Sequence, residues 1–473
     1  MRAGISFSLV IMLASLASSA SAQDTYFVNA GLATGNNDGS SWTDAFQGPG
    51  GVQAALAQAV AGDQVWIAAG TYPPTAGADR TASFEPADGV SLYGGFAGTE
   101  SSLGDRDPVT NVTTLSGDLN GDDGPDFQNR SDNAYNIVVV TDGNVVLDGM
   151  TFSGANGSDN PDNQVGGGGV LVEFQAGVDI TQCDFIGNEA YHGAGLDIRG
   201  AAHLERCRFI GNRATGSFGI GGAATSFVGF ASENATFTNC LFVGNRATIG
   251  GGAVGADHSG LMMNNCTVVG NETTEGTFGG GVMMQGTFGT LHIANTIIWG
   301  NVTTDGSSDE LTQLWNPNLN DFLVLNHSTV QGFTGTRIFL GSGNSNTAPS
   351  FVDDLGGDGM PATGDEDYKL GLTSPLIDAG NNALVPAGVV TDLEGQPRFV
   401  DVSATPDTGS GSAPIVDLGA FESQGGPAAV PAVGSWGLLA AVLCLLSAAT
   451  HVFRRTALPV SPVTSTRSPR STT

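Results

Sequence analysis

The chain has 473 residues, 71 of them glycine, and a formal net charge of -30 at pH 7. Only 16 Lys and Arg residues stand against 46 Asp and Glu residues, so a surface that neutralises nucleic-acid phosphates is not expected. The glycines follow no collagen period and alternate with short Val, Ile, Phe and Leu runs, which predicts tight corners between short strands.

The first 22 residues have the layout of a cleavable secretory signal. One early base, Arg2, precedes an apolar stretch over residues 5–16, and Ala20-Ser21-Ala22 supplies the small residues of a cleavage site. The apolar stretch falls short of the ~20 residues that span a bilayer. We therefore expect residues 1–22 to be removed and the mature protein to be exported.

The segment over residues 23–104 is predicted to begin the fold and to cover its open end. The sequence "GGVQAALAQAVAGDQVWIAAGTYPPT" favours a short amphipathic helix from Val52 to Ala61, followed by a strand that contains Val65 and Ile67. Such a helix is expected to plug the first turn of the repeat described below, because a repeat array exposes its core at each end.

Residues 105–133 form an acidic excursion that contains "GDLNGDDGPD". Its candidate metal ligands are Asp118, Asn120, Asp122 and Asp126. The EF-hand frame fails, because Asp123 stands where the turn requires Gly and Asn129 stands where a bidentate Glu is required. Asp358 and Asp365, in a second acidic segment over residues 353–368, are candidates of the same kind. For both segments, a structural Ca²⁺ site and a solvated acidic turn remain alternatives.

A repeated pattern of apolar offsets occupies residues 134–350. Its clearest copies surround Cys183, Cys207, Cys240 and Cys266. Each cysteine stands four residues before a Gly-Asn pair, with apolar side chains at offsets -5, -3 and +2. The same frame surrounds Met150, Thr296 and Ser328, which makes seven copies. Offsets of two keep side chains on one face of a strand, whereas the step from -3 to 0 requires a bend.

Residue types that tolerate a left-handed backbone stand near this bend. They are Gly149, Asn239, Asn264, Asn265, Asn295 and Asn326. Copies lie 24 to 33 residues apart, with a third short strand behind a Gly cluster. This arrangement predicts an all-β fold, a right-handed parallel β-helix or solenoid. Another β-solenoid or a β-sandwich is the alternative.

The four repeat cysteines are predicted to form a buried structural ladder of free thiols. They occupy the slot that Met150, Thr296 and Ser328 fill in other copies, so the slot requires a modest side chain and no thiol chemistry. Strands about 4.8 Å apart bring neighbouring cysteines within disulfide reach in an exported protein. Oxidation of stacked pairs is therefore the alternative.

Residues 351–424 carry a different apolar block with three motifs. They are Ser374-Pro375-Leu376-Ile377-Asp378-Ala379-Gly380, then Asp392-Leu393-Glu394-Gly395 with Arg398, then Asp417-Leu418-Gly419-Ala420-Phe421-Glu422. Together with the opening segment from Tyr26 to Pro74, this block resembles exported bacterial right-handed β-helix proteins of the pectin-lyase-like superfold that have a "choice-of-anchor Q" end. The resemblance implies a C-terminal cap and is nearly silent on activity.

A tail that is typical of membrane sorting follows. After a linker over residues 425–435, residues 436–453 are mostly apolar and are followed by Arg454 and Arg455, the layout of a transmembrane helix with a cytoplasmic basic flank. The stretch "VPAVGSWG", with Pro431 and Trp436, resembles PEP-CTERM or IPTL-CTERM sorting tails. The resemblance implies handling by envelope sorting machinery. The polar tail over residues 454–473 continues beyond the point where such tails usually stop.

One charged group is expected on the outer face of the strand that follows the Gly clusters. It consists of Glu173, Asp197 and Arg199, stacked on adjacent turns. Two carboxylates at this separation suit acid and base roles or a shared cation, with Arg199 binding a uronate. The alternative is an ordinary surface ion pair. The sequence contains no GxSxG, Walker or CxxC motif.

Two classes of function remain. The favoured one is an exported, envelope-associated β-helix that acts as a non-catalytic structural, adhesive or glycan-binding scaffold, with glycans or cell-surface proteins as partners and the membrane reached through the C-terminal helix. It requires no cofactor, and Ca²⁺ is the candidate ion. The alternative is a polysaccharide lyase or glycoside hydrolase that acts on acidic polysaccharide.

Overall fold

The computed structural model describes residues 23–160, 166–217, 219–227, 235–276, 279–286, 289–316, 323–335, 340–360 and 363–425. The predicted signal, the predicted membrane helix and the sorting residues Pro431, Trp436, Arg454 and Arg455 lie outside these ranges. Within them, no helix has the length and apolar character needed to cross a membrane.

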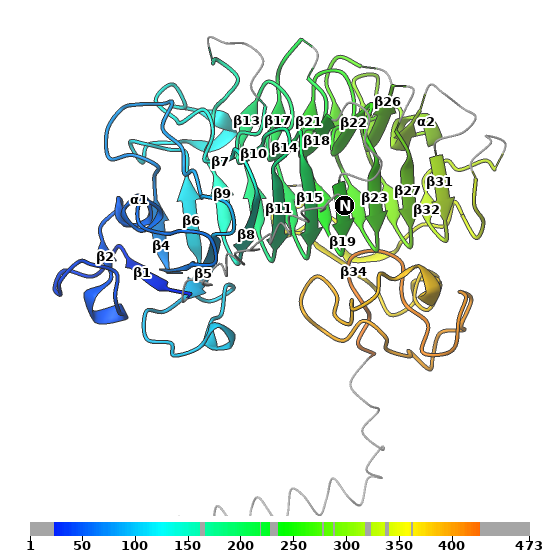
Figure 1. Cartoon of the computed structure of the whole chain (residues 1–473). Coiled ribbons are helices and arrows are strands. Elements are labelled where there is room, and N and C mark those ends of the chain that lie inside the picture. The colour runs from blue at the N-terminus through cyan, green and yellow to red at the C-terminus, as the bar shows by residue number, and fades with distance from the viewer. Residues whose placement is uncertain are drawn as a thin grey trace, which may run out of the picture. The chain divides into compact units, whose positions relative to one another are not determined.

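Parallel strands stack in columns along the described chain (Figure 1). Sheet A contains the strands before each bend: β1 (Thr25–Asn29), β2 (Phe46–Gln47), β3 (Gln64–Ala68), β5 (Ser91–Phe96), β8 (Asn144–Asp148), β11 (Gly177–Thr181), β15 (Ala201–Glu205), β19 (Ala235–Thr238), β23 (Leu261–Asn264), β27 (Leu291–Ala294) and β31 (Leu323–Asn326). Sheet B contains the strands after it: β4 (Gly70–Tyr72), β6 (Thr113–Ser116), β9 (Thr151–Ser153), β12 (Asp184–Ile186), β16 (Arg208–Ile210), β20 (Leu241–Val243), β24 (Thr267–Val269), β28 (Ile297–Trp299) and β32 (Thr329–Val330).

Two further columns complete each turn. Sheet C contains the strands behind the Gly clusters: β7 (Val138–Val140), β10 (Val170–Val172), β14 (Leu196–Ile198), β18 (Ala224–Phe227), β22 (Val254–Asp257), β26 (Val282–Gln285) and β30 (Leu314–Trp315). Sheet D contains two-residue strands that the sequence did not indicate: β13 (Glu189–Ala190), β17 (Arg213–Ala214), β21 (Arg246–Ala247), β25 (Glu272–Thr273) and β29 (Val302–Thr303). A central turn therefore has four strands, where the sequence predicted three.

The seven predicted copies stack in register, which confirms the parallel β-solenoid. Ile180 pairs with Leu204, and Leu204 pairs with Phe237, so the same offset of each copy meets the next one. Inward side chains build one continuous core, in which aromatic rings stack between turns. The ring centroids of Phe185 and Phe209 are 4.4 Å apart, and those of Phe209 and Phe242 are 5.0 Å apart, a favourable separation for offset aromatic pairs.

The asparagine of each Gly-Asn pair forms a buried ladder along the solenoid. Asn212 Nδ2 donates to Asn245 Oδ1 at 2.9 Å, and Asn245 Nδ2 donates to Asn271 Oδ1 at 2.9 Å. Asn271 continues to Asn301 at 2.8 Å, and Asn301 ends on Gln313 Oε1 at 2.7 Å. Because each amide also bonds backbone groups of neighbouring turns, the ladder satisfies polar groups that a dry corner would otherwise leave unpaired.

The Gly clusters permit the close approach of successive turns. A Cβ on Gly195 would lie 2.6 Å from the carbonyl oxygen of Ala223 in the next turn. That separation is too short for any side chain, so the glycine is required by packing at this corner.

All four repeat cysteines lie in the core as free thiols. Burial first, and the adjacent cysteines next, raise the pKa of the Cys183 and Cys240 thiols well above 9.0, so the reactive thiolate is disfavoured. In a thiol titration at pH 8, we expect these four cysteines to be unreactive in the native protein and to react in guanidinium chloride. Failure to react after denaturation would show that they had oxidised.

The bend between sheets A and B uses a left-handed residue in every copy. These residues are Gly149, Gln182, Arg206, Asn239, Asn265, Asn295 and His327. Asn264 and Asn326, which the sequence also suggested, lie one residue too early. Three copies place residues other than Gly or Asn at this position, which the sequence did not predict.

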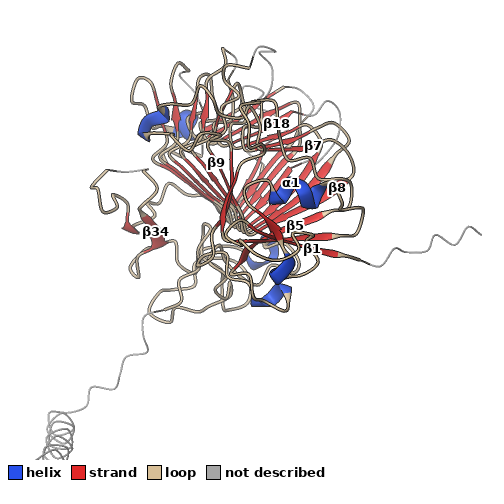
Figure 2. Cartoon of the chain, turned by 90° about the vertical axis from the view of Figure 1, so that its left-hand side faces the viewer, coloured by secondary structure: helices blue, strands red, loops and turns tan. Residues whose placement is uncertain are grey.

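The N-terminal end of the solenoid is covered by a helix (Figure 2). This helix, α1 (Gly51–Leu56), buries Val52 and Ala55. It ends at Leu56, five residues before the predicted Ala61. Near the other end lies α2 (Glu310–Gln313), whose last residue terminates the asparagine ladder. Single 3₁₀ turns occur at Trp42–Asp44, Leu103–Asp105, Pro125–Phe127 and Asn382–Leu384.

The segment predicted as a cap covers the flank of the solenoid instead of its end. It contains the antiparallel pair β33 (Phe351–Asp353) and β34 (Asp367–Leu370). Leu241 and Val243 on the outer face of sheet B pack against Leu393 and Phe421 in one apolar cluster. Figure 1 shows this segment in orange beside the central turns.

Side chains at the bends hold the C-terminal segment in place. Asn239 Nδ2 donates to the Thr391 carbonyl at 2.8 Å. Asn295 Nδ2 donates to the Asn381 carbonyl at 3.0 Å. Asn239 and Asn295 therefore both form the left-handed bends and anchor the C-terminal segment to the solenoid.

Candidate functional site

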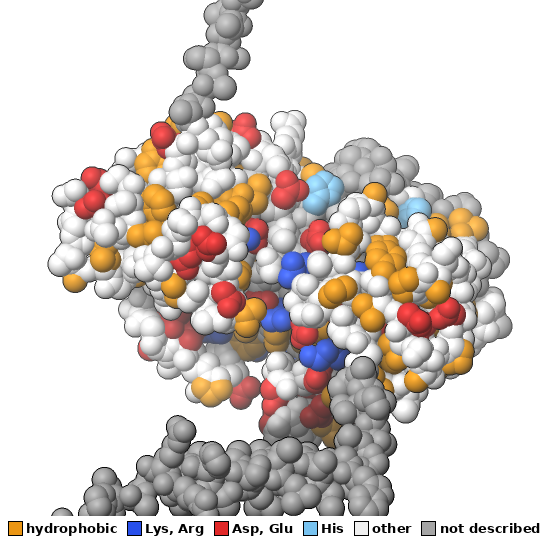
Figure 3. Space-filling model, turned by 90° about the horizontal axis from the view of Figure 1, so that it is seen from below, with side chains coloured by type: hydrophobic (Ala, Val, Ile, Leu, Met, Phe, Trp, Pro, Cys, Tyr) orange, Lys and Arg blue, Asp and Glu red, His pale blue; other side chains and the backbone are white. Residues whose placement is uncertain are grey.

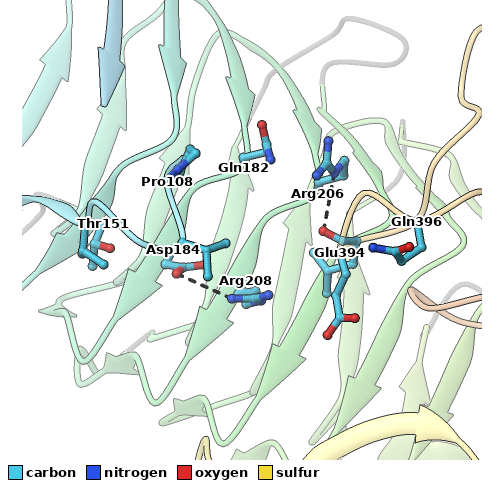
Figure 4. A pocket seen from close by; sticks show the side chains of 11 residues that line it. Pro108, Thr151, Gln182, Asp184, Arg206, Arg208, Glu394 and Gln396 are labelled. Carbon is cyan, nitrogen blue, oxygen red and sulfur yellow. Dashed lines mark hydrogen bonds and ion pairs between the residues drawn. The ribbon is translucent and has the colours of Figure 1, made fainter. Parts of the chain in front are cut away.

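A groove of about 400 Å³ lies where the C-terminal segment stops covering sheet B. Its lining residues are Pro108, Val109, Val112, Thr151, Gln182, Asp184, Arg206, Arg208, Leu393, Glu394 and Gln396. The three segments that contribute them are far apart in sequence: the loop at 108–112, the turns around 151–208 and the motif at 393–396. Figure 4 shows the polar side chains around this space.

The floor of the groove is the outer face of sheet B. Thr151 pairs with Asp184, and Asp184 pairs with Arg208, so the three side chains occupy successive rungs of one column. The neighbouring inward residues are phenylalanines of the core, which fix the outward direction of these polar groups. Exposed Val109 and Val112 add an apolar wall.

Two groove residues stand at left-handed bend positions. Gln182 has φ of 51° and Arg206 has φ of 58°, a region that costs a residue with a Cβ roughly 1–2 kcal/mol. Four other copies place Gly or Asn at this position. Strained backbone is concentrated at functional sites; Gln182 and Arg206 share this feature with His327, which lies outside the groove.

The guanidinium of Arg206 is positioned by backbone alone. Its Nε donates to the Leu393 carbonyl at 3.4 Å, and among the described residues it forms no ion pair with a carboxylate. A Cβ on Gly395 would lie 2.6 Å from Arg206 Nη2. The glycine of the 392–395 motif therefore makes room for the Arg206 guanidinium, whose charge acts on Asp148 without forming an ion pair with it.

Arg208 is only loosely paired. Its Nη1 lies 3.9 Å from Asp184 Oδ2, and about a third of each side chain is exposed. Burial raises the pKa of Asp184 above 3.8, and Arg208 opposes that rise. Glu394 is held by Lys369, with Nζ and Oε1 3.0 Å apart. Asp184 pairs only weakly with Arg208, and Glu394 pairs with Lys369. The guanidinium groups of Arg206 and Arg208 are therefore available to an anionic ligand.

The groove continues on both sides as a furrow. A cavity of about 380 Å³, lined by Arg106, shares Pro108 and Gln182 with the groove. A cavity of about 250 Å³, lined by Lys369, shares Arg208 and Glu394 with it. The furrow thus has Arg106, Arg206, Arg208 and Lys369 along it, four of the 16 bases in the chain, together with the carboxylates of Asp184, Glu366, Asp367 and Glu394. Arg106 pairs with Asp148 at 2.5 Å, and Lys369 pairs with Asp367 and Glu394. Figure 3 shows Lys and Arg side chains gathered in the hollow between two lobes.

Replacing Arg206 with asparagine is expected to stabilise the protein by about 0.5–1 kcal/mol, because asparagine accepts the left-handed conformation at lower cost. Urea unfolding of the Arg206→Asn variant measures this change. The matched control is Arg246→Asn. The Arg246 side chain is 57% exposed in the wild type and lies outside the furrow. A loss of stability in Arg206→Asn would contradict the assignment of strain.

The charged trio predicted on sheet C does assemble, but it is not an open site. Arg199 Nε lies 3.0 Å from Asp197 Oδ2, and Arg199 Nη1 lies 3.3 Å from Glu173 Oε2. Asp197 has no exposed surface, which corrects its expected outward exposure. Its Oδ1 accepts from Thr225 at 2.7 Å, and His192 Nδ1 lies 3.5 Å away.

The environment of Asp197 keeps it ionised. Burial raises its pKa, but His192, Arg199 and Thr225 together lower that pKa below 3.8. A buried carboxylate whose oxygens are already engaged cannot contact a polysaccharide. Its neighbours Glu173 and Arg199 are partly exposed, so the trio is best described as a structural ion network.

The acidic excursion brings together a set that only partly matches the predicted one. Ligand atoms of Asp118, Asp122 and Asp132 lie within 4.8 Å of one another. Predicted Asp126 is not in that group, whereas Asn120 lies beside it, with its backbone N–H donating to Asp132 Oδ2 at 3.1 Å. Asp118 accepts backbone hydrogen bonds from Gly121 at 2.7 Å and from Asp123 at 3.1 Å. Both of its carboxylate oxygens are therefore already hydrogen-bonded within the loop.

The second acidic segment forms turns. Asp358 accepts from the backbone N–H of Met360 at 2.8 Å, and Asp365 accepts from that of Gly357 at 2.9 Å. Among the described residues, neither belongs to a group of three possible metal ligands. A different group of three carboxylates does form, at Asp378, Asp401 and Asp407. These residues lie outside the repeat, so no periodic pattern in the sequence indicates them.

Comparison with known proteins supports the fold. The family described as "Right handed beta helix region" matches residues 126–301, which bears out the predicted handedness and class for those turns. No curated protein matches the sequence. A solved structure described as "Crystal structure of pectate lyase Pel9A" is 16% identical, with a TM-score of 0.43, covering 85% of this chain and 97% of the other. This likeness does not indicate shared activity.

Proposed function

We propose that this protein is an exported β-helix scaffold of the cell envelope that binds acidic glycans in the furrow without cleaving them. The observation that carries the proposal is the collection of Arg106, Arg206, Arg208 and Lys369 along one hollow of a chain with net charge -30. Most of such an acidic surface repels polyanions, so the bases of the furrow make it the proposed place of attraction for a carboxylated sugar chain.

The chemistry of the furrow suits a uronate chain. Guanidinium groups bind carboxylates with two parallel hydrogen bonds, and Arg206 forms no ion pair with a described carboxylate within 4.0 Å. Gln182, Thr151 and Gln396 supply hydrogen-bonding groups for hydroxyls, while Val109 and Val112 offer apolar surface to sugar rings. Adjoining cavities provide an extended path, as a polymer requires.

The export signal, membrane helix and sorting tail belong to this proposal. The signal pattern over residues 1–22 and the apolar run over residues 436–453 support transport to the envelope and attachment there. Neighbouring surface proteins are further candidate partners of the same scaffold.

Isothermal titration with a defined oligogalacturonate tests the binding step. We expect the Arg206→Gln/Arg208→Gln variant to bind at least tenfold more weakly, because each substitution removes a charge-assisted contact. Arg246→Gln is the matched control and should bind like the wild type. Affinity should also fall with added salt. Equal affinity of the double variant and the wild type would refute the assignment of the furrow.

A lyase or glycoside hydrolase is the second candidate, and two groove residues favour it. Asp184 and Glu394 both line the groove, and the raised pKa of Asp184 is a property of general acids. Incubation with uronate polymers, with and without Ca²⁺, separates the candidates. Turnover that Asp184→Asn abolishes would establish the enzyme.

A further inference from the structure

A loop of the C-terminal segment closes over Asp378, on a part of the molecule that the furrow does not use. The backbone N–H groups of Thr408 and Gly409 both donate to the Asp378 carbonyl at 3.0 Å. Asp401 and Asp407 lie at either end of this 401–407 loop. The loop therefore brings two carboxylates back to a third one that precedes them by more than twenty residues.

The side chain of Asp378 has no exposed surface, and neither carboxylate oxygen accepts a hydrogen bond from the described residues. The backbone N–H of Val402 is near enough to lower its pKa slightly but does not reach hydrogen-bonding geometry. The nearby Asp417 is different, because it accepts from Asp378 N at 2.8 Å and from Ser423 N at 2.7 Å. Native proteins rarely leave a buried carboxylate without partners.

The surroundings of Asp378 are negative. Burial and then Asp417 raise its pKa to about 6, and Asp407 and Asp401 add to the rise. The protein thus concentrates repulsion at a buried acid and supplies no described cation to relieve it, since Arg398, the nearby base, pairs with Glu422. A bound cation would remove this repulsion.

Geometry fits one ion held by three oxygens. One carboxylate oxygen from each of Asp378, Asp401 and Asp407 lies within 4.8 Å of the others. Oxygens about 2.3–2.6 Å from a shared Ca²⁺ have separations up to about this size. The group has only oxygen donors, which suits hard cations rather than zinc. Ligands on an irregular loop suit Ca²⁺ better than Mg²⁺, which demands near-ideal octahedral geometry.

We propose that Asp378, Asp401 and Asp407 bind one Ca²⁺ ion. The ion joins the 401–407 loop to the motif that contains Asp378 and so holds the C-terminal segment together. This site is separate from the Asp118, Asp122 and Asp132 group and does not depend on the proposed glycan binding.

Hydrogen exchange of peptides covering residues 378–409 tests the site in the purified protein, with EGTA or with 5 mM CaCl₂, a trial concentration above the roughly millimolar affinity of weak extracellular sites. We expect Ca²⁺ to slow exchange there at least tenfold and to leave the central turns unchanged. The Asp378→Asn variant should lose this response, while the control Asp122→Asn should keep it. Because asparagine removes the buried charge, Asp378→Asn in EGTA should exchange no faster than the wild type.

Three results would overturn the proposal. The first is a Ca²⁺ response of Asp378→Asn equal to that of the wild type. The second is a response lost only in Asp122→Asn, which would place the ion in the acidic excursion. The third is a wild type whose exchange does not respond to Ca²⁺. An equal response to Mg²⁺ at the same concentration would overturn the choice of ion.

Discussion

Replacing Asn245 with alanine is expected to lower the free energy of unfolding by about 3–5 kcal/mol, since each unsatisfied buried polar group costs roughly 1–3 kcal/mol. Asn245 Oδ1 accepts from both Asn212 N and Asn212 Nδ2, at 3.0 and 2.9 Å. Its Nδ2 donates to the Phe209 carbonyl at 2.9 Å. Alanine supplies none of these bonds, and the site has no exposure to water.

Urea unfolding followed by circular dichroism measures this loss. The matched control is Asn36→Ala, because Asn36 is exposed, and we expect it to change stability by less than about 0.5 kcal/mol. If Asn245→Ala also changed stability by so little, the asparagine ladder would not be the main polar support of the corners.

Replacing Arg398 with methionine is expected to release the C-terminal segment at a cost of about 3–5 kcal/mol, because the buried Asp417 and Gly419 carbonyls and the Glu422 side chain lose their partner, at roughly 1–3 kcal/mol for each unsatisfied group. Arg398 has no exposed surface. Its Nε lies 3.7 Å from Glu422 Oε2, and its Nη2 donates to the Gly419 carbonyl. With the Asn265 amide turned so that Oδ1 faces the guanidinium, this side chain also accepts from Arg398.

The loss should depend on pH in a defined direction. Burial raises the pKa of Glu422 from 4.5 to about 9, against the opposing effect of Arg398. For an acid whose folded-state pKa is raised, ionisation destabilises the fold above the unfolded pKa. Because Glu422 is protonated in both folded proteins below its raised pKa, the charge-related part of the Arg398→Met defect should be absent below about pH 9 and should grow as the pH rises above it.

Hydrogen exchange over residues 378–422 reports the release, with the central turns as an internal reference. The Arg398→Met/Glu422→Gln double variant should lose less stability than the sum of its single variants, because no unpaired charge remains. Additive losses, or unchanged protection of this segment in Arg398→Met, would contradict the proposed role of the pair.

The solenoid was predictable because its repeat is local. Offsets around Cys207 and Cys240 identify inward positions directly, since strand period and one bend per copy determine which side chains face the core. The Gly-Asn pairs were visible in the sequence as well. Their ladder was not, because the contact joins the same offset of successive turns and not neighbouring residues.

The furrow could not be found in the same way. Arg206 and Gln182 stand at the bend position, where four other copies of the repeat have Gly or Asn. This difference is informative only when the left-handed backbone of the bend is known. Leu393 and Glu394 reach the groove from a segment without any repeat. Asp197 was predicted to be exposed because strand alternation places its side chain on the outer face. In the structure, Thr225 and His192 cover this side chain.

A glycan array with the purified wild type and the Arg206→Gln/Arg208→Gln variant tests the central claim most directly. We expect the wild type to bind glycans that carry uronates, the double variant to lose this binding, and the bound glycans to remain intact. Binding restricted to neutral glycans, binding that the double variant retains, or release of shortened products would contradict this claim.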